Sequence, residues 1–460
     1  MLKFFKQHKI EFAVFFVAVI ARLVFFFICL NANGGNLINT IHGQDGYFEL
    51  SKNLLLGNGF SINPTPPFFE YSYGVPMYPF FLAFLLWATQ SYAATAMIQL
   101  LLAALTPLIG MHLTRLVLPS HPLFDHAPLV VGILLAIVPY QMLFSFSFYT
   151  ETLFILVFWI FLILFLNFLK TPSTRLAVWS GLFLGLATLT KPTVQYIVVV
   201  AIVFALWHFR NELRRDIMLK LASFSLIFFI VLAPWLYRNY QTFNMINLGS
   251  QVPFNLYEVL LPSVLAIENQ TSFALEQQKL PLKAADIFFD TPESLLGEAL
   301  TEILRHPLAL IKLSILNSVT FFTHDGMLTF LQNAGVKQDA NLGKPALLLF
   351  LSSPVEFAKV VWPYMRTPMA FVFFARLFGI VVTVFFGLGL YKLWHLKLFS
   401  PRLLFVTIIV LYFMLTTMIN GLAVNARFRM PVEPIIFAIA YVGFSFSWER
   451  IKKKPTKQIS

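Results

Sequence analysis

Cysteine is almost missing from this sequence, since Cys29 is the one cysteine among 460 residues. A single cysteine cannot form a disulfide within the chain, so the loops must fold without that covalent link. Charge is scarce as well, because Asp, Glu, Lys and Arg together make up only 12% of the residues. A water-soluble globule needs more polar surface than this. The two shortages exclude a disulfide-stapled domain and a soluble globular protein.

The sequence also lacks the short motifs of several common enzyme classes. It contains no glycine-rich phosphate loop with a following lysine and no Rossmann fingerprint. We therefore expect no nucleotide-sugar site. The spacing of His and Cys residues matches no metal motif, which leaves His42 and His324 as loose ligand candidates only. No cofactor is predicted with certainty, and a divalent metal stays open.

What the sequence does have is apolar residues in long runs. Hydrophobic residues make up 58% of the chain, and the mean hydropathy is +0.76. The length suffices for roughly ten helical spans of about 20 residues each, with one or two sizeable loops. The net charge of +12 comes from short basic clusters between apolar runs, as the positive-inside rule expects, and we predict no nucleic-acid partner. The expected fold class is an all-α polytopic membrane protein.

The basic clusters predict the topology. Lys3, Lys6 and Lys9 precede an apolar run and place the N-terminus of an uncleaved first span in the cytoplasm. The other clusters that we place inside are Arg115, Lys170 with Arg175, 210–220, Lys392 with Lys397 and Arg402, and the tail 450–457. The spans predicted on this basis are 11–30, 94–114, 128–147, 152–169, 176–190, 193–208, 219–236, 368–391, 402–419 and 431–448.

Three further apolar stretches fit this topology less directly. The stretch 76–87 is short for a span, and we interpret it as a juxtamembrane helix. The stretches 308–322 and 346–362 either both span or both lie on the surface, so we expect 10 to 12 transmembrane helices. The predicted parts of the chain are an N-terminal transmembrane module (1–236) with a first outer loop (31–75), an outer-face segment (237–367) with membrane-associated helices, and C-terminal helices with a basic tail (368–460).

Six charged residues fall on the predicted outer face, next to the membrane. An ionisable side chain at membrane depth costs roughly 2.5–3.5 kcal/mol on insertion scales, so each of them needs a reason. Asp45 can instead be a helix cap, and each cation can be a residue that snorkels from a helix end. Their convergence on one face favours a functional site. The residues are the carboxylates Asp45 and Glu151 and the cations Lys191, Arg238, Arg427 and Arg429.

This mixture of charges suits a lipid-linked phosphate sugar. Lys and Arg can pair with a phosphate at headgroup level and stabilise it as it leaves. A nearby carboxylate can take the proton from an attacking hydroxyl. The pattern therefore predicts glycosyl transfer from a lipid carrier to a hydroxyl acceptor.

At these residues the chain resembles the membrane glycosyltransferases with the C-type fold, in the branch that includes protein O-mannosyltransferases and the aminoarabinose transferase of lipid A. The resemblance covers most of the chain from Arg22 to about Tyr240 and returns at 427–434, and the order of its motifs is its most persuasive feature. The matching stretches are 44–54 with Gly57-Asn58-Gly59-Phe60, 74–79, 150–154, 186–193, 234–239 and Arg305-His306-Pro307.

The resemblance implies an inverting transfer from a polyprenyl-phosphate sugar that enters from the outer leaflet. It implies Asp45 as the general base and Glu151 as the residue that orients the acceptor or the base. The other implied site residues are Lys191, Arg238 and Arg427 or Arg429 at the lipid phosphate, with Tyr47 and Tyr78 as secondary substrate contacts.

The sequence departs from the family pattern in the cations and in the first loop. Lys191 stands where the family usually has Arg, which keeps the charge but loses the bidentate fork. Tyr71 and Tyr73 stand where relatives often carry an Arg. Gly46 replaces a frequent second acidic residue, which argues against a two-carboxylate metal site in this loop.

Other interpretations of the sequence stay open. A transporter or flippase of lipid-linked sugars also has many spans, although we find no repeated halves. A polymerase or ligase of lipid-linked glycans would use the long segment after Arg238, and an inert scaffold subunit is a third alternative. We expect a bacterial inner membrane, with an intracellular eukaryotic membrane as the alternative, both termini in the cytoplasm and the active site on the outer face. The sugar, carrier length, acceptor and oligomeric state are not predicted. Arg22 lies midway along the first span, and we favour a structural role for it.

Overall fold

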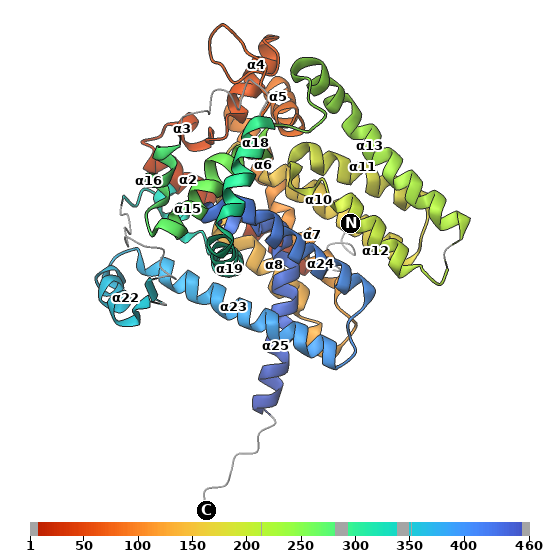
Figure 1. Ribbon diagram of the computed structural model, residues 1–460. Coiled ribbons are helices and arrows are strands. Elements are labelled where there is room, and N and C mark those ends of the chain that lie inside the picture. The colour runs from red at the N-terminus through yellow and green to blue at the C-terminus, as the bar shows by residue number, and fades with distance from the viewer. Residues whose placement is uncertain (1–7, 213, 281–292, 338–348, 351, 453–460) are drawn as a thin grey trace, which may run out of the picture.

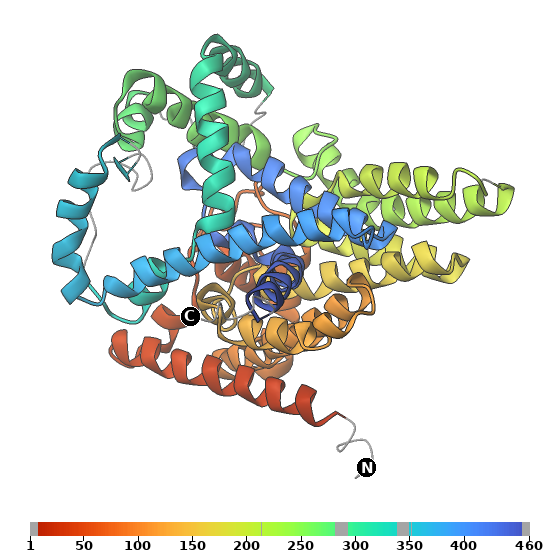
Figure 2. The same ribbon diagram turned by 90° about the horizontal axis from the view of Figure 1, so that it is seen from below.

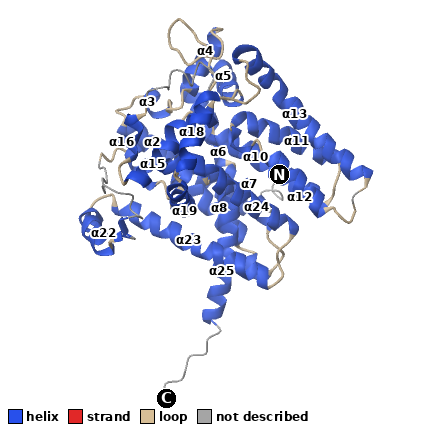
Figure 3. Ribbon diagram, in the orientation of Figure 1, coloured by secondary structure: helices blue, strands red, loops and turns tan. Residues whose placement is uncertain are grey.

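The protein is built from helices. The computed structural model describes residues 8–212, 214–280, 293–337, 349–350 and 352–452, and within these ranges every regular element is helical (Figure 3). The predicted all-α class is confirmed. Lys3, Lys6, most of the tail 450–457 and part of the stretch 346–362 lie outside the described residues.

The helices pack against one another and form one bundle (Figure 1). Their bounds are α2 Lys9–Ala32, α3 Leu37–Ile41, α4 Tyr47–Leu56, α5 Met77–Thr89, α6 Tyr92–Ala104, α7 Thr106–Val117, α8 Ala127–Ile137, α9 Pro139–Leu143, α10 Glu151–Lys170, α11 Thr174–Thr190, α12 Ile197–His208, α13 Arg215–Phe243, α14 Gln251–Phe254, α15 Leu261–Asn269, α16 Phe273–Lys279, α18 Glu293–Arg305, α19 Pro307–Thr323, α20 Met327–Asn333, α22 Pro354–Val361, α23 Ala370–His395, α24 Pro401–Thr416 and α25 Glu433–Lys452.

Seven helices in the described ranges are long and apolar enough to cross a membrane. They are Lys9–Ala32, Tyr92–Val117, Glu151–Lys170, Arg215–Phe243, Ala370–His395, Pro401–Ala423 and Met430–Glu449. Five shorter apolar helices, including α11 and α19, bring the number close to the predicted 10 to 12. Large apolar side chains face outward on these helices, for example Phe27 on α2 and Phe374 on α23, each 60% exposed. Such a surface suits lipid as its solvent.

The predicted span 128–147 is wrong as a continuous helix. Helix α8 ends at Ile137, Val138 is extended (ψ 128°), and α9 begins at Pro139. Proline disfavours helical geometry in the residue before it and cannot donate a backbone hydrogen bond. After the short α9 the chain is not helical from 144 to 150, and this loop leads directly into α10.

Arg22 occupies the break between α8 and α9. Its guanidinium is fully buried and donates to the carbonyl oxygens of Ala136 (3.0 Å) and Leu135 (3.4 Å) at the end of α8. The last carbonyls of a helix lack partners within it, and a cation there is favoured by the helix dipole. The structural role predicted for Arg22 therefore agrees with its contacts.

Helix α13 is longer than predicted. The helix runs from Arg215 to Phe243, with Pro234 inside it, so the predicted span 219–236 is only part of it. The first residues of the predicted outer segment, including Arg238, are still part of this helix. The apolar stretch 76–87 forms a separate helix, α5, which exposes Phe80, Phe84 and Trp87 on one face.

Close helix crossings bring distant parts of the chain together. A methyl group on Gly443 of α25 would lie 2.1 Å from the carbonyl oxygen of Phe385 on α23. A methyl group on Gly181 of α11 would lie 2.3 Å from that of Phe224 on α13. Glycine at these points lets two helix backbones touch, as is common in membrane bundles. Both views show α23 crossing α25 (Figures 1 and 2).

The core of the bundle lies around α10. Its residues Phe158, Trp159 and Phe161 are completely buried. The indole nitrogen of Trp159 donates to the carbonyl oxygen of Pro431 at 2.7 Å. This bond fixes the segment before α25 against the centre of the bundle.

Candidate functional site

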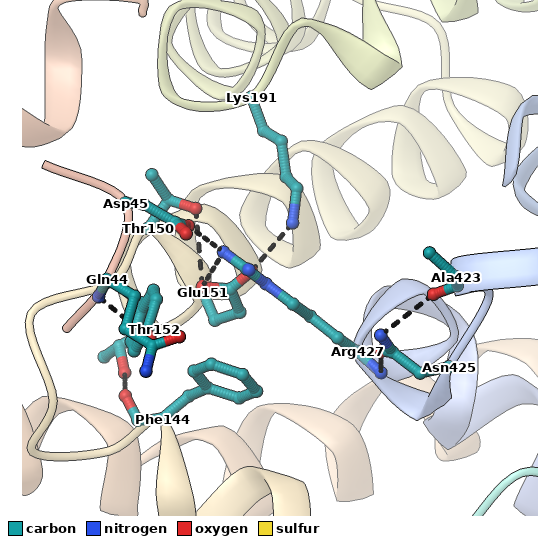
Figure 4. Close-up of polar contacts among 11 residues, drawn as sticks. Gln44, Asp45, Phe144, Thr150, Glu151, Thr152, Lys191, Ala423, Asn425 and Arg427 are labelled. Carbon is teal, nitrogen blue, oxygen red and sulfur yellow. Dashed lines mark hydrogen bonds and ion pairs between the residues drawn. The ribbon is translucent and has the colours of Figure 1, made fainter. Parts of the chain in front are cut away.

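Four of the predicted site residues form one cluster, although they come from distant parts of the chain (Figure 4). The Arg427 guanidinium contacts Asp45 Oδ2 at 2.6 Å and Glu151 Oε1 at 2.5 Å. Lys191 Nζ lies 2.8 Å from the same Glu151 oxygen. Two cations and two carboxylates therefore share a network in which Arg427 bridges both acids. We call these four residues the charge cluster.

Helix ends supply three members of the charge cluster. Glu151 is the first residue of α10, Lys191 follows the end of α11, and Arg427 lies between α24 and α25. An acidic residue in a first turn is favoured by the helix dipole. Because these ends meet, the cluster lies at one end of the bundle. The sequence predicted this convergence from the alternation of spans and basic clusters.

Glu151 holds the two cations together. It is 2% exposed, and an isolated carboxylate buried to this degree would be costly. Oε1 accepts from Arg427 and Lys191, and Oε2 accepts from Arg427 (3.3 Å) and from the hydroxyl of Thr150 (3.4 Å). Its bonds suit the role of an organiser of cations. Both carboxylate oxygens of Glu151 are engaged in these bonds. The structure therefore gives no support to the predicted role of Glu151 in orienting the acceptor or the base.

The segment around Arg427 is rigidly held. Asn425 accepts a hydrogen bond from the Arg427 amide at 2.9 Å and starts a short 3-10 turn. The guanidinium lies over the rings of Phe144 (5.2 Å) and Tyr149 (5.0 Å), which contribute cation–π attraction. Backbone and side chain are thus both fixed, and the guanidinium can present the same fork to a ligand.

Asp45 sits at the exposed edge of the cluster. It is not the cap of α4, because the capping position is Gly46, whose φ of 74° favours glycine. The carboxylate pairs with Arg427 instead. Its side chain is 34% exposed, against 2% for Glu151. Of the two carboxylates, Asp45 is the one that an incoming hydroxyl could reach.

The electrostatics of the two cations differ. Burial acts to lower the pKa of Arg427, but the charges of Glu151 and Asp45 outweigh it and hold that pKa well above its usual value. Burial lowers the pKa of Lys191, although Glu151 opposes this effect. Arg427 is therefore a permanent charge. The charge of Glu151 favours the protonated form of Lys191 and so opposes the effect of burial.

Tyr47 and Tyr78 are buried, close enough to the cluster for the charges of Asp45 and Glu151 to act on both. Their rings form an edge-to-face pair at 5.2 Å, and the Tyr78 hydroxyl donates to Gln99 at 2.8 Å. Burial first, and then the charge of Asp45, raises the pKa of Tyr47. Their burial gives no support to the predicted direct contact with substrate.

Arg238 is not part of the charge cluster. Its guanidinium pairs with Glu70 and donates to the carbonyl oxygen of Tyr71 at 3.2 Å. It also lies 4.6 Å from the Trp235 ring and 5.4 Å from the Phe60 ring. These contacts tie the first loop to α13. The geometry gives no support to the prediction that Arg238 binds the same phosphate as Arg427.

Arg429 is placed differently from what we predicted. It is 7% exposed and donates to the carbonyl oxygens of Phe321 (3.3 Å) and Phe322 (2.5 Å) at the end of α19. It also lies 3.5 Å from the buried Glu433. Its two terminal nitrogens are engaged in these contacts, while its buried Nε has no hydrogen-bond partner among the described residues, and the contacts fit a structural anchor. We therefore remove it from the proposed phosphate contacts.

His324 fixes the other side of the Arg427 segment. Its Nδ1 accepts from the amides of Gly326 (3.1 Å) and Ala426 (3.2 Å), which requires the tautomer with the proton on Nε2. Burial, followed by the charge of Arg376, lowers the pKa of His324 to about 4. The imidazole therefore stays neutral near pH 7 and keeps its backbone contact.

The described ranges contain no group of three or more His, Cys, Asp or Glu residues placed to hold a metal ion. His42 lies 2.6 Å from Glu49, and His324 makes the backbone contacts above. Neither histidine joins the charge cluster, so the residues of this chain give no assignment for the divalent metal that the sequence left open.

Tyr149 belongs to the site, although sequence reasoning assigned it no role. Its hydroxyl oxygen accepts from the Gln44 amide at 3.0 Å, and its ring lies under Arg427. The sequence feature that could have identified Tyr149 is its position two residues before Glu151, in a polar break between apolar runs. Phe144 was missed because the span 128–147 was expected to contain it.

Neither protein-family models nor curated proteins give a match to this chain.

Proposed function

We propose that the protein is a membrane glycosyltransferase that moves a sugar from a polyprenyl-phosphate carrier to a hydroxyl acceptor, on the non-cytoplasmic face of the membrane. One observation carries the proposal: Arg427 bridges a buried carboxylate and a more exposed one, with Lys191 beside it. The cluster thus combines donors for a phosphate with a reachable base, at the end of a lipid-facing bundle.

The cations act on the donor. Arg427 and Lys191 contact the phosphate of the carrier by charge-assisted hydrogen bonds, which are stronger than neutral ones. When the bond between the sugar carbon C1 and the phosphate oxygen breaks, its electron pair stays on that oxygen. The two cations stabilise the added charge. Glu151 keeps both of them in place through its ion pairs.

Asp45 acts on the acceptor. The acceptor oxygen forms the new bond to C1 on the face opposite the leaving phosphate, and its proton passes to the Asp45 carboxylate. The products are the inverted glycoside, the free lipid phosphate and a protonated Asp45. All atoms and charges balance without any further reactant.

The ion pair between Asp45 and Arg427 suggests an order of events. The Asp45 carboxylate is paired with the Arg427 guanidinium at 2.6 Å, and this contact occupies the oxygen that would otherwise face the acceptor hydroxyl. A donor phosphate competes for the same guanidinium nitrogen and leaves Asp45 free. The donor therefore binds before the base becomes active.

The test is sugar transfer by the purified protein in nanodiscs, from a set of labelled polyprenyl-phosphate sugars, with and without a chelator. The variant Asp45→Asn keeps the shape of the side chain and removes the base. We expect its transfer rate to fall by about 10²-fold to 10⁴-fold, while expression and melting temperature match the wild type. The chelator arm reports directly on a divalent metal.

Three results would count against the proposal as stated. Undiminished turnover by Asp45→Asn would remove Asp45 as the base. Donor-independent movement of lipid or solute across the bilayer, with no transfer from any donor, would favour a transporter or flippase. Transfer of a lipid-linked glycan onto another such glycan would instead point to the polymerase or ligase alternative.

A further inference from the structure

Tyr149 connects the loop that carries Asp45 to the Arg427 guanidinium. Its hydroxyl oxygen accepts from the backbone amide of Gln44, the residue before Asp45, at 3.0 Å. Its ring lies 5.0 Å from the guanidinium carbon of Arg427. One half-buried side chain thus contacts the loop of the base and the principal cation.

The backbone around Tyr149 is joined to the same loop. The Phe148 amide donates to the carbonyl oxygen of Ile41 at 2.7 Å. A methyl group on Gly43 would lie 2.9 Å from the carbonyl oxygen of Phe148, and the φ of Gly43 is +73°. The loop 41–45 therefore lies directly on residues 148 and 149. Within this seam, the hydroxyl of Tyr149 makes the contact nearest to Asp45.

The aromatic ring of Tyr149 has a separate function, which is to support Arg427. Phe144 and Tyr149 form an edge-to-face pair with centroids 5.0 Å apart, and both lie within 5.2 Å of the guanidinium carbon. Burial first, and then the charge of Asp45, raises the pKa of Tyr149, so the phenol stays neutral. A neutral hydroxyl can accept the Gln44 hydrogen bond without opposing the nearby carboxylate.

We propose that Tyr149 is a positioning residue that keeps Asp45 in line with the substrate after the donor phosphate has taken Arg427 from it. This inference rests on the proposed function. Once the ion pair to Arg427 is exchanged, Asp45 loses its strongest side-chain contact. The hydrogen bond from Gln44 to Tyr149 does not involve Arg427, and it persists through the exchange.

Two variants separate the contacts of Tyr149. Tyr149→Phe removes only the hydroxyl and keeps the ring under Arg427, whereas Tyr149→Leu removes both. Tyr140→Phe is the matched control, because its hydroxyl lies 3.3 Å from that of Thr329 on α20 and makes no contact with the loop 41–45. All three are measured in the full chain in nanodiscs.

The first measurement is hydrogen exchange of the peptide that contains residues 41–46, without substrate. We expect Tyr149→Phe to speed exchange at the Gln44 amide by about tenfold, since a hydrogen-bonded amide must open to exchange. Tyr140→Phe should leave this peptide unchanged. This arm requires no substrate, so it decides the placement of the loop whether or not the proposed function holds.

The second measurement is the kinetics of transfer. For Tyr149→Phe we expect kcat to fall by about tenfold or more with little change in the KM for the donor, because a misplaced base slows the chemical step. Tyr149→Leu should in addition raise that KM, since Arg427 loses its ring support. A merely structural tyrosine would lower the folded yield and leave the kcat of the folded protein unchanged.

Each outcome decides the inference. Unchanged exchange in Tyr149→Phe overturns the placement, and faster exchange with an unchanged kcat overturns the positioning role. Faster exchange with a lower kcat supports both. A wild type that transfers no sugar overturns the proposed function and with it the catalytic meaning of Tyr149, while the exchange result still stands on its own.

Discussion

Arg427 and Arg429 are two residues apart, yet they serve two different regions of the molecule. Arg427 faces two carboxylates at an accessible end of the bundle, and its side chain is 22% exposed. Arg429 is 7% exposed and donates to backbone carbonyls at the end of α19. Arg22, fully buried on the carbonyls of α8, resembles Arg429 in this respect.

The partners distinguish the two kinds of arginine. A guanidinium that donates to helix-end carbonyls satisfies groups that would otherwise be unpaired, and a ligand would gain nothing by displacing it. A guanidinium shared between carboxylates near solvent can exchange one of them for a phosphate. Charge at a membrane surface is therefore a weaker indicator of function than the identity of the partner.

Among changes to the cations, the largest expected effect comes from breaking the bridge at Arg427. Arg427→Lys keeps one positive charge but cannot contact Asp45 and Glu151 with a planar fork. We expect kcat/KM for transfer to fall by about 10²-fold or more, with a melting temperature close to that of the wild type. Activity within threefold of the wild type would show that the fork is not needed.

The matched change at Arg429 should affect stability instead. Arg429→Met leaves Glu433 buried without its cation, which typically costs about 3–5 kcal/mol. We expect a lower melting temperature and yield, whereas the folded fraction keeps kcat/KM within about threefold of the wild type. Adding Glu433→Gln should recover part of the stability. A normal melting temperature with lost transfer would instead place Arg429 at the substrate.

The smallest effect is expected at Lys191, where the comparison can be sharpened. Lys191→Met removes one charge-assisted contact to the donor phosphate, and we expect the KM for the donor to rise by about tenfold. Lys191→Arg keeps the positive charge beside Glu151 and should stay close to the wild type. Equal losses in both variants would show that the size of the side chain matters more than its charge.

The coarse fold could be predicted from composition and apolar runs, and the main error was at Pro139. The runs mark helices because a span must satisfy its backbone within itself. The proline was visible in the sequence, but the apolar run 128–147 continued beyond it. Hydropathy does not reveal a helix break whose unpaired carbonyl oxygens are satisfied by a side chain such as Arg22. The end of α13 was placed too early because hydropathy marks only the apolar part of a helix. Polar residues can continue the same helix beyond the membrane.

The sequence by itself determined that this chain is a helical membrane protein and that charged residues collect at one set of helix ends. Hydrophobicity and its periodicity are local properties, so the order of residues carries them. Only the tertiary structure decided which of these charges meet. Asp45, Glu151 and Arg427 are joined through the packing of α10 and the turn at 425–429, and Tyr149 joins them through a loop that no local pattern predicts. A shift of two residues within a tight turn is enough to send one arginine to the cluster and the next to the interior.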